Sequence, residues 1–208
     1  MTGLHERRRA LSKGERTRER LLRAAIDRFG ADGYRATSVS QLSRDAGLTP
    51  AAAYAYFDDK EALWYAAISA ELDALRAEVA GAALRDERPI LAMVMGVIDG
   101  MQGHALARRV MVEGSPKDLQ FVLNHPLFAS LTSMVLAGLI ARQERGVLPP
   151  EADPAQLALG IESVIFSLVL GVVRAGMEGE PERVDAVVAM LYAAAGGPPT
   201  AQERRLPQ

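Results

Sequence analysis

The sequence predicts an all-α protein of about nine helices, with an N-terminal three-helix unit and a larger C-terminal helical domain. Three observations predict this fold class. Apolar residues recur at helical rather than strand spacing along most of the 208 residues. Residues that suit helix N-caps precede several of these runs. Finally, two short helical stretches flank Gly47, which is the layout of a helix-turn-helix.

The first helix is predicted from a capping pair and an apolar stripe. Ser12 and Glu15 have the spacing of a capping box, in which each side chain bonds the other residue's backbone amide. Gly33 is expected to end this helix. The apolar stripe between them comprises Leu21, Leu22, Ala25, Ile26 and Phe29.

The next two helices are short. Ser38 and Gln41 repeat the capping-box spacing and open a helix of about two turns that stops at Gly47. Thr49 can cap the following helix, and Pro50 suits its first position, where no amide donor is needed. We expect that helix to run to about Tyr56.

A longer helix follows, capped by Asp58 or Asp59 and apolar at helical spacing as far as Val79. Beyond it, proline and glycine punctuate five or six further helices. Asp153 and Pro154 give one of these a strong start. The same helix is apolar on almost every face between residues 161 and 173, so we expect it to be buried all round.

Charge is distributed unevenly along the chain. Residues 1–60 carry a formal charge of +4 and the remainder −6, within an overall −2. A basic head on an acidic body suggests a polyanionic partner, although a solvated helix face is the ordinary alternative. The charged N-terminus lacks the apolar core of a secretory signal. The apolar run 157–173 falls short of the roughly 20 residues of a membrane span. We therefore expect a cytoplasmic protein that does not enter membranes.

A helix-turn-helix predicts DNA binding by a specific geometry. Its second helix enters the major groove, and groups on either side of that helix bind phosphates. Tyr54, Tyr56 and Lys60 would bind the phosphates. The alternative from spacing alone is a helical hairpin whose tyrosines lie at the edge of the core.

Residues 17–63 resemble the DNA-binding domain of the tetracycline-repressor (TetR) family of bacterial transcription regulators. The matching stretches are FGADGYRATSV, QLSRDAGLT and YAYFDDKEAL, and the last places Tyr54, Tyr56, Phe57, Lys60 and Glu61 in register with the family. The resemblance covers 47 residues directly, and beyond them only the number and rough length of the helices agree.

The resemblance implies DNA contacts at eleven positions. Thr37 and Ser38 would bind a phosphate through hydroxyls and helix-end amides. Ser40 and Arg44 on the second helix would assist readout by the recognition helix. The residues of the expected interface are Thr37, Ser38, Ser40, Arg44, Thr49, Pro50, Ala51, Ala52, Tyr54, Tyr56 and Lys60.

The recognition helix departs from the family pattern. Lysine, glycine and serine or threonine are common where this chain has Pro50, Ala51 and Ala52, and histidine is common at Ala55. Thr49 is therefore the one clear polar reader, supplemented by apolar contact with thymine methyl groups and by DNA shape. Arg7, Arg8 and Arg9 form either a DNA-contacting arm or a solvated tail.

Two C-terminal helices resemble the pair that forms a four-helix dimer interface in this family. Small residues recur every four positions on the first, and a valine-rich stripe follows the second; the alternative is a monomer core. The expected interface residues are Ser163, Ser167, Gly171, Val184, Val187, Val188 and Leu191. We expect residues 1–60 to hold the arm and DNA-binding domain, and residues 61–208 the effector-binding and dimerisation domain.

The middle helices hold most of the methionines, which suggests an adaptable apolar effector cavity, with ordinary core packing as the alternative. Its expected lining is Met93, Met101, His104, Met111, Phe128, Met134 and Phe166. His125, before Pro126, is expected to start a helix. No metal-ligand spacing, phosphate-binding loop or nucleophile motif is present, and there is no cysteine, so we expect no cofactor and no enzymatic activity.

The sequence therefore predicts a homodimeric regulator, most simply a repressor, that binds a near-palindromic double-stranded DNA operator and is released by a small, mostly apolar effector. Two alternatives stay open. One is a helical protein-interaction module, and the other is a regulator without a small-molecule effector.

Overall fold

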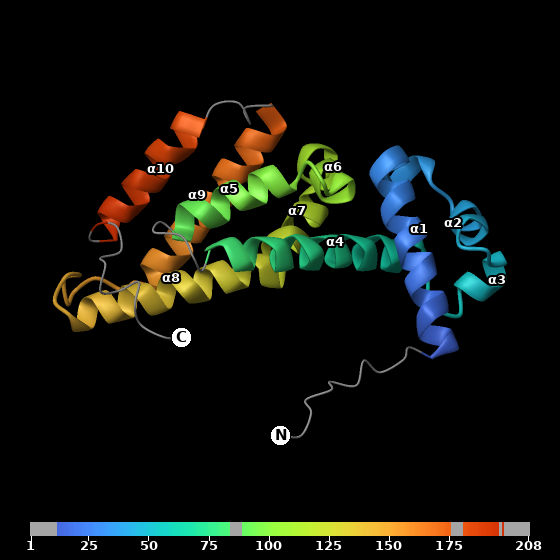
Figure 1. Cartoon of the computed structure of the whole chain (residues 1–208), viewed down its shortest axis with the longest axis horizontal. Helices are drawn as coiled ribbons and strands as arrows, with labels where there is room; N and C mark the ends of the chain where they lie inside the picture. Colours follow the sequence, from blue (N-terminus) through green and yellow to red (C-terminus); the bar gives the residue numbers. More distant parts are fainter. Residues whose placement is uncertain (1–11, 84–88, 176–180, 196, 198–208) are drawn as a thin grey trace, which may run out of the picture. The chain divides into compact units, whose positions relative to one another are not determined.

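A computed structural model describes residues 12–83, 89–175, 181–195 and 197, and all its regular structure is helical (Figure 1). The all-α prediction is confirmed, with ten helices in the described residues where about nine were expected. They are α1 Lys13–Ala36, α2 Val39–Asp45, α3 Pro50–Ala53, α4 Lys60–Ala83, α5 Pro89–Gly100, α6 Ala105–Glu113, α7 Pro116–Leu123, α8 Pro126–Glu144, α9 Pro154–Ala175 and α10 Pro181–Ala194.

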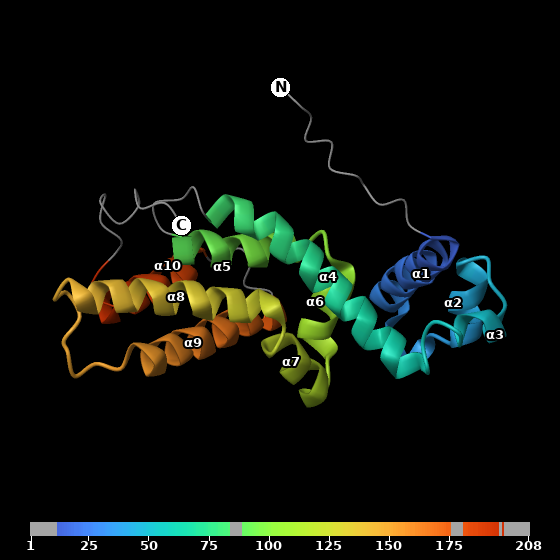
Figure 2. The same ribbon diagram turned by 90° about the horizontal axis from the view of Figure 1, so that it is seen from below.

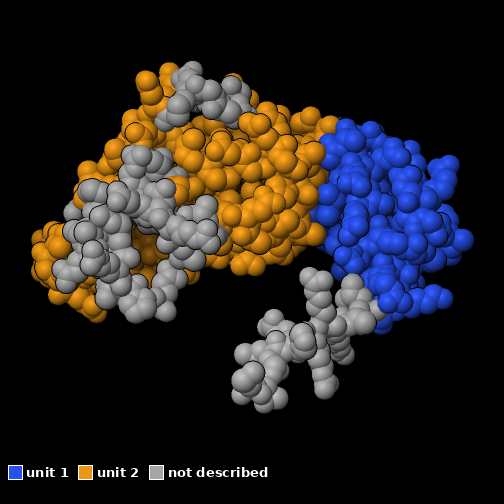
Figure 3. All heavy atoms as spheres, viewed as in Figure 1, with its two compact units in different colours: residues 1–67 blue, residues 68–208 orange. Residues whose placement is uncertain are grey.

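The chain divides into two compact units, coloured separately in Figure 3. The first extends from Met1 to Ala67, and the second begins at Ile68. This division falls inside α4, seven residues after the expected one at residue 60.

Local side-chain caps start the N-terminal helices as predicted. Complete capping boxes form at Ser12 with Glu15 and at Ser38 with Gln41. In the first, hydrogen bonds from the backbone amide and hydroxyl of Ser12 lower the pKa of Glu15, because they stabilise its ionised form. The Thr49 side chain caps α3, and Asp59 Oδ1 accepts a bond from the Ala62 amide in the first turn of α4.

The ends of α1 and α3 differ in detail from the sequence prediction. Helical geometry in α1 breaks at Gly33, the predicted end, where φ is 81° and ψ is 170°. Glycine adopts this positive φ at no steric cost. The helix α3 is shorter than predicted and covers only Pro50–Ala53, and Tyr54 to Tyr56 continue as turns.

The core of the N-terminal unit combines aliphatic residues of α1 and α2 with an aromatic cluster. Leu21, Ala25 and Leu42 are fully buried. Phe29 and Trp64 pack edge to face with ring centroids 5.1 Å apart, and Trp64 packs in the same manner on Tyr34 at 5.3 Å. This cluster fixes the start of α4 against the end of α1.

In the C-terminal unit, α9 packs against α5, α6 and α8, and the α8–α9 pair is clearest in Figure 2. The expectation that α9 is buried all round is wrong for the protomer. Ile161, Ile165 and Val169 face the core, but Leu159 is 59% exposed and Val164 36% exposed. The outward face of α9 is therefore apolar and uncovered in a single chain.

By length and composition alone, α8 and α9 are each apolar enough to cross a membrane. The 22-residue length of α9 exceeds the apolar run considered in the sequence, so the length argument does not exclude a span. A core helix of a soluble protein passes the same test, and both helices contribute buried faces to this unit.

Candidate nucleic-acid interface

The turn between α2 and α3 is fixed by backbone hydrogen bonds and one glycine. The Leu48 amide donates to Ser43 O at 2.7 Å, and the Gly47 amide donates to Arg44 O at 3.0 Å. Gly47 has φ of 67°, a conformation that favours glycine. The turn therefore holds α3 in a defined direction relative to α2.

The solvent-facing side of α3 carries the predicted reading residues. Thr49, Pro50 and Ala51 are exposed, Ala52 is half-buried, and Ala53 points into the core. The Thr49 hydroxyl accepts a bond from the Ala52 amide at 3.2 Å. Its own O–H and a second lone pair remain for a base edge. The face is otherwise apolar and smooth, which suits contact with thymine methyl groups.

The predicted phosphate-binding tyrosines lie just after α3. Tyr54 is 53% exposed, and Tyr56 is half-buried. The exposed position leaves the Tyr54 hydroxyl accessible to a phosphate.

The start of α2 presents only part of the predicted set. Ser38, Ser40 and Arg44 are exposed. Thr37 is 2% exposed, and its hydroxyl donates to Gly33 O at 2.8 Å. This side chain closes the corner after α1, so we correct its expected role: the Thr37 hydroxyl stabilises the corner instead of facing a phosphate. Ser38 keeps its exposed position while it caps α2.

The structure gives Lys60 intramolecular partners that its place in the motif did not indicate. Its Nζ donates to Tyr34 O at 2.9 Å and to Thr37 O at 3.0 Å. The same ammonium lies 4.1 Å from the centroid of the Tyr34 ring. One N–H of the ammonium remains beyond these two bonds. Lys60 therefore joins the first residue of α4 to the last turn of α1 and the corner after it.

Two further contacts in this unit were absent from the sequence prediction. Arg28 joins α1 to α2 through bonds of 3.0 and 2.8 Å to Asp45 Oδ2, and these bonds raise its pKa, with a smaller contribution from Asp32. Arg18 lies 4.7 Å over the Phe57 ring. In both pairs the two residues are far apart in sequence, so no local spacing predicts the contact.

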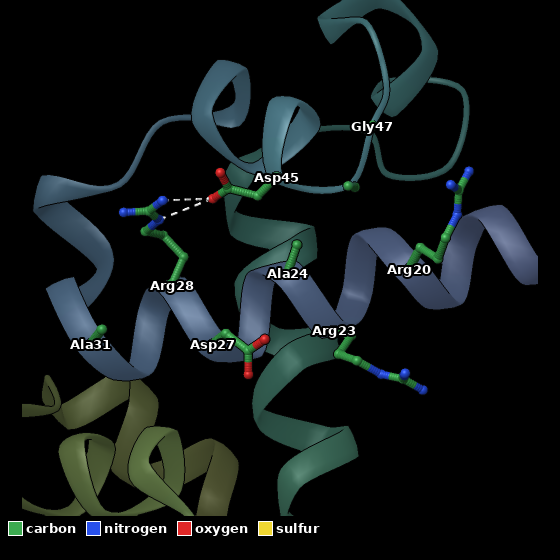
Figure 4. A pocket seen from close by; sticks show the side chains of 9 residues that line it. Arg20, Arg23, Ala24, Asp27, Arg28, Ala31, Asp45 and Gly47 are labelled. Carbon is green, nitrogen blue, oxygen red and sulfur yellow. Dashed lines mark hydrogen bonds and ion pairs between the residues drawn. The ribbon is translucent and has the colours of Figure 1, made fainter.

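An open groove of about 620 Å³ runs between α1 and the turn that precedes α3 (Figure 4). We call it the α1–turn groove. Its charged lining residues are Arg20, Arg23, Asp27, Arg28 and Asp45, and Gly47 lies at one end.

The predicted dimer residues separate into two groups. Ser163, Ser167 and Gly171 are exposed on α9, and no atom lies within 4 Å of a Cβ placed on Gly171. On α10, by contrast, the valine stripe faces the core of its own protomer: Val184, Val188 and Leu191 are buried, and Val187 is half-buried. The side of α10 left for a partner carries Met190, which is 55% exposed.

The predicted effector residues also separate. Met93 and Met134 line one cavity of about 140 Å³ together with Val79, Ala80, Leu127, Arg76 and Ser130. Met101, Met111 and Phe128 are buried core residues, and the Phe128 ring packs on Phe166 with centroids 5.2 Å apart. Two of the seven predicted residues, Met93 and Met134, therefore line this cavity.

The described histidines have structural surroundings. His104 is 8% exposed, with ring nitrogens 3.4 Å from Glu71 Oε2 and from Glu78 Oε1. The Leu127 amide donates to His125 Nδ1, so His125 caps α8 and starts that helix as predicted. Within the described residues, no group of three or more His, Cys, Asp or Glu side chains is placed to hold a metal ion. The predicted arginine arm at residues 7–9 lies outside the described residues.

Comparison with known proteins identifies the N-terminal unit. The family described as bacterial regulatory proteins, tetR family, matches residues 21–67. An uncharacterised HTH-type transcriptional regulator, YdgC of Bacillus subtilis, is 42% identical over 53 residues. That alignment covers 26% of this chain and 27% of YdgC, so the chain spans about a quarter of the length of this curated relative.

Solved structures share the fold over most of the chain. The fatty acid degradation regulator FadR of Bacillus halodurans has a TM-score of 0.63 at 15% identity, covering 84% of this chain and 94% of FadR. SmeT, the repressor of the Stenotrophomonas maltophilia efflux pump SmeDEF, has a TM-score of 0.60 at 19% identity and coverages of 88% and 92%. A TetR-family regulator from Cytophaga hutchinsonii has a TM-score of 0.64 at 16% identity and coverages of 88% and 96%.

Proposed function

The match over residues 21–67 places the chain in the tetR family of bacterial regulatory proteins, and we propose that the protein is a homodimeric transcription repressor. Each dimer binds a near-palindromic double-stranded DNA operator and is released by a small, mostly apolar effector. The family consists of regulators rather than enzymes, and the proposal assigns the protein to the cytoplasm.

The observation that carries this proposal is the exposed face of α3. Thr49, Pro50 and Ala51 project from a helix whose other side is anchored by buried Ala53 and by the Gly47 turn. A helix held in this way can enter a major groove about 12 Å wide without rearrangement. Exposed Ser38, Ser40, Arg44 and Tyr54 flank it and supply phosphate contacts.

The outward face of α9 supports the homodimer. It presents exposed Leu159 and Val164 beside the small residues Ser163, Ser167 and Gly171. Small residues permit close helix approach, and the flanking apolar side chains gain free energy when a second copy covers them. A dimer also matches the two half-sites that a helix-turn-helix protein commonly binds.

The cavity beside Met93 and Met134 supports an apolar effector. Its volume of about 140 Å³ is close to that of an engineered cavity that binds benzene, which is about 150 Å³. It would take one ring-sized apolar group of a ligand. An effector releases DNA only if it prefers the dimer conformation that binds DNA less well. The proposal of repression follows SmeT, a repressor whose fold this chain shares.

Selection of bound fragments from a random DNA pool tests the proposal and yields the operator. We expect enrichment of near-palindromic sites whose half-sites lie a whole number of helical turns apart. Recovery of no sequence preference at physiological salt would instead favour the helical protein-interaction module. Specific DNA binding that no apolar or amphipathic compound changes would leave a regulator without a small-molecule effector.

A further inference from the structure

We propose that Arg20 on α1, outside the helix-turn-helix, binds a DNA phosphate beside the recognition helix. This inference rests on the proposed DNA-binding function and extends the interface to the α1–turn groove. Nothing in the helix-turn-helix spacing pointed to Arg20, because it precedes α2 by almost twenty residues.

The two ends of the α1–turn groove differ in charge. At one end, the Arg28 guanidinium is bonded to Asp45 Oδ2 and to Asp32 Oδ2, so its charge is compensated. Arg23 faces Glu19 at 3.4 Å. For Arg20, the described part of the chain places no carboxylate within ion-pair distance. Among the arginines that line the groove, Arg20 is therefore the one that no carboxylate of the described residues pairs with, and it lies at the opposite end from the Arg28–Asp45 pair (Figure 4).

Arg20 lies directly beside the turn that starts the recognition helix. Its Nη1 would be 3.9 Å from a Cβ built on Gly47, and apart from Gly47 and its two chain neighbours no other residue has an atom within 4 Å of that position. Gly47 precedes the α3 cap, Thr49, by two residues, a separation of at most about 7 to 8 Å along the chain. With the Cα–Cβ bond of Gly47 added, the guanidinium is thus within about 13 Å of Cα of the residue proposed to read a base.

This distance matches the wall of a major groove. The groove is about 12 Å wide, and an α-helix with its side chains is about 10 to 12 Å across, so a helix inside it lies against phosphates on both sides. A guanidinium next to the N-terminus of that helix is then level with one row of phosphates. Arginine binds phosphate with two parallel hydrogen bonds and keeps its charge at every physiological pH.

The test compares Arg20→Gln with Arg23→Gln in the full-length protein. Both arginines are exposed on α1 and line the same groove, and both variants lose one positive charge. Anisotropy of a fluorescent operator obtained by selection gives the affinity at salt concentrations from 50 to 200 mM. Trp64 fluorescence checks that each variant is folded, because the single tryptophan is buried in this unit.

A phosphate contact sets the size of the expected change. Each contact contributes about 0.9 to the slope of log affinity against log salt, and a dimer would lose two, so the slope for Arg20→Gln falls by about 1.8. Over the fourfold salt range, the wild type then loses about 12 times more affinity than this variant. Arg23→Gln should keep the wild-type slope.

Three results would overturn the inference. Unchanged slopes in both variants would mean that Arg20 is a solvated side chain, while wild-type operator binding would leave the proposed function intact. Equal decreases in both would indicate a general effect of positive charge on α1 and no local contact. Absence of specific DNA binding by the wild type would reject the proposed function, and the Arg20 contact with it.

Discussion

Substitution of Lys60 tells whether this side chain acts within the protein or binds a DNA phosphate. In Lys60→Met, the side chain keeps an unbranched apolar stem of nearly the same length but loses the bonds to Tyr34 O and Thr37 O and the charge over the Tyr34 ring. Charge-assisted hydrogen bonds contribute about 1.5 to 3 kcal/mol each, and a partly exposed cation–π contact about 0.5 to 1 kcal/mol. Because Lys60 is half-buried we take the low end, and the side-chain entropy regained by release offsets part of it. The net destabilisation should be about 2 kcal/mol.

Urea unfolding followed by Trp64 fluorescence measures this loss in the N-terminal unit. Trp64 is the single tryptophan and packs against Tyr34, so its emission reports the structure that Lys60 holds. With a denaturant slope of about 1 to 2 kcal/mol per molar, the midpoint should fall by about 1 to 2 M. Lys60→Arg should recover most of the loss, because a guanidinium can donate to both carbonyls and lie over the ring.

The salt dependence of operator binding provides the opposing readout. If Lys60 acts within the protein, Lys60→Met weakens specific binding and leaves the slope against salt unchanged. An unchanged urea midpoint together with a slope lowered by about 1.8 per dimer would refute this reasoning and assign Lys60 to a phosphate, as the sequence first suggested.

The outward face of α9, the exposed face of α3 and His125 can each be tested by substitution. Gly171→Glu should fold normally, because the added Cβ meets no neighbouring side chain within 4 Å, but light scattering at micromolar concentration should show it to be monomeric. The control Ser133→Glu, on an exposed side of α8, should remain dimeric. If both variants are dimers, the α9 interface is rejected. Ala51→Glu should abolish specific operator binding, because it places a carboxylate against the negative potential of the major groove. The uncharged control Ala51→Gln should weaken binding far less. Equal operator affinities of the two variants would show that the α3 face does not meet DNA. Burial lowers the pKa of His125, so below about pH 6.5 the folded state binds fewer protons than the unfolded chain and loses stability as the pH falls. His125→Asn, which retains a helix cap, should lose less stability on acidification in urea titrations. Parallel pH profiles of the variant and the wild type would show that His125 is not the group responsible.

Features that depend on neighbouring residues could be predicted from the sequence. The caps at Ser12, Ser38 and Thr49 were predicted correctly because each joins residues three apart. The TetR-family resemblance is confirmed for the same reason, since its motif is a local pattern of turn and cap residues.

Contacts between distant segments could not be predicted in this way. Lys60 meets carbonyls 26 and 23 residues away, and Arg28 meets a carboxylate 17 residues away. The periodicity of α10 predicted an apolar stripe but did not say what covers it. The structure shows that Val184 and Val188 cover their own core, and the outward face of α9 remains uncovered. A stripe specifies burial, and only the tertiary structure specifies against which surface.

The central claim is sequence-specific DNA binding by the α3 face of a dimer. Its most direct measurement is selection from a random double-stranded DNA pool by the wild type and by Ala51→Glu in parallel at physiological salt. We predict that the wild type enriches one near-palindromic site, with half-sites a whole number of helical turns apart, and that the variant enriches none. Enrichment of the same site by both proteins, or of no site by the wild type, would contradict the account.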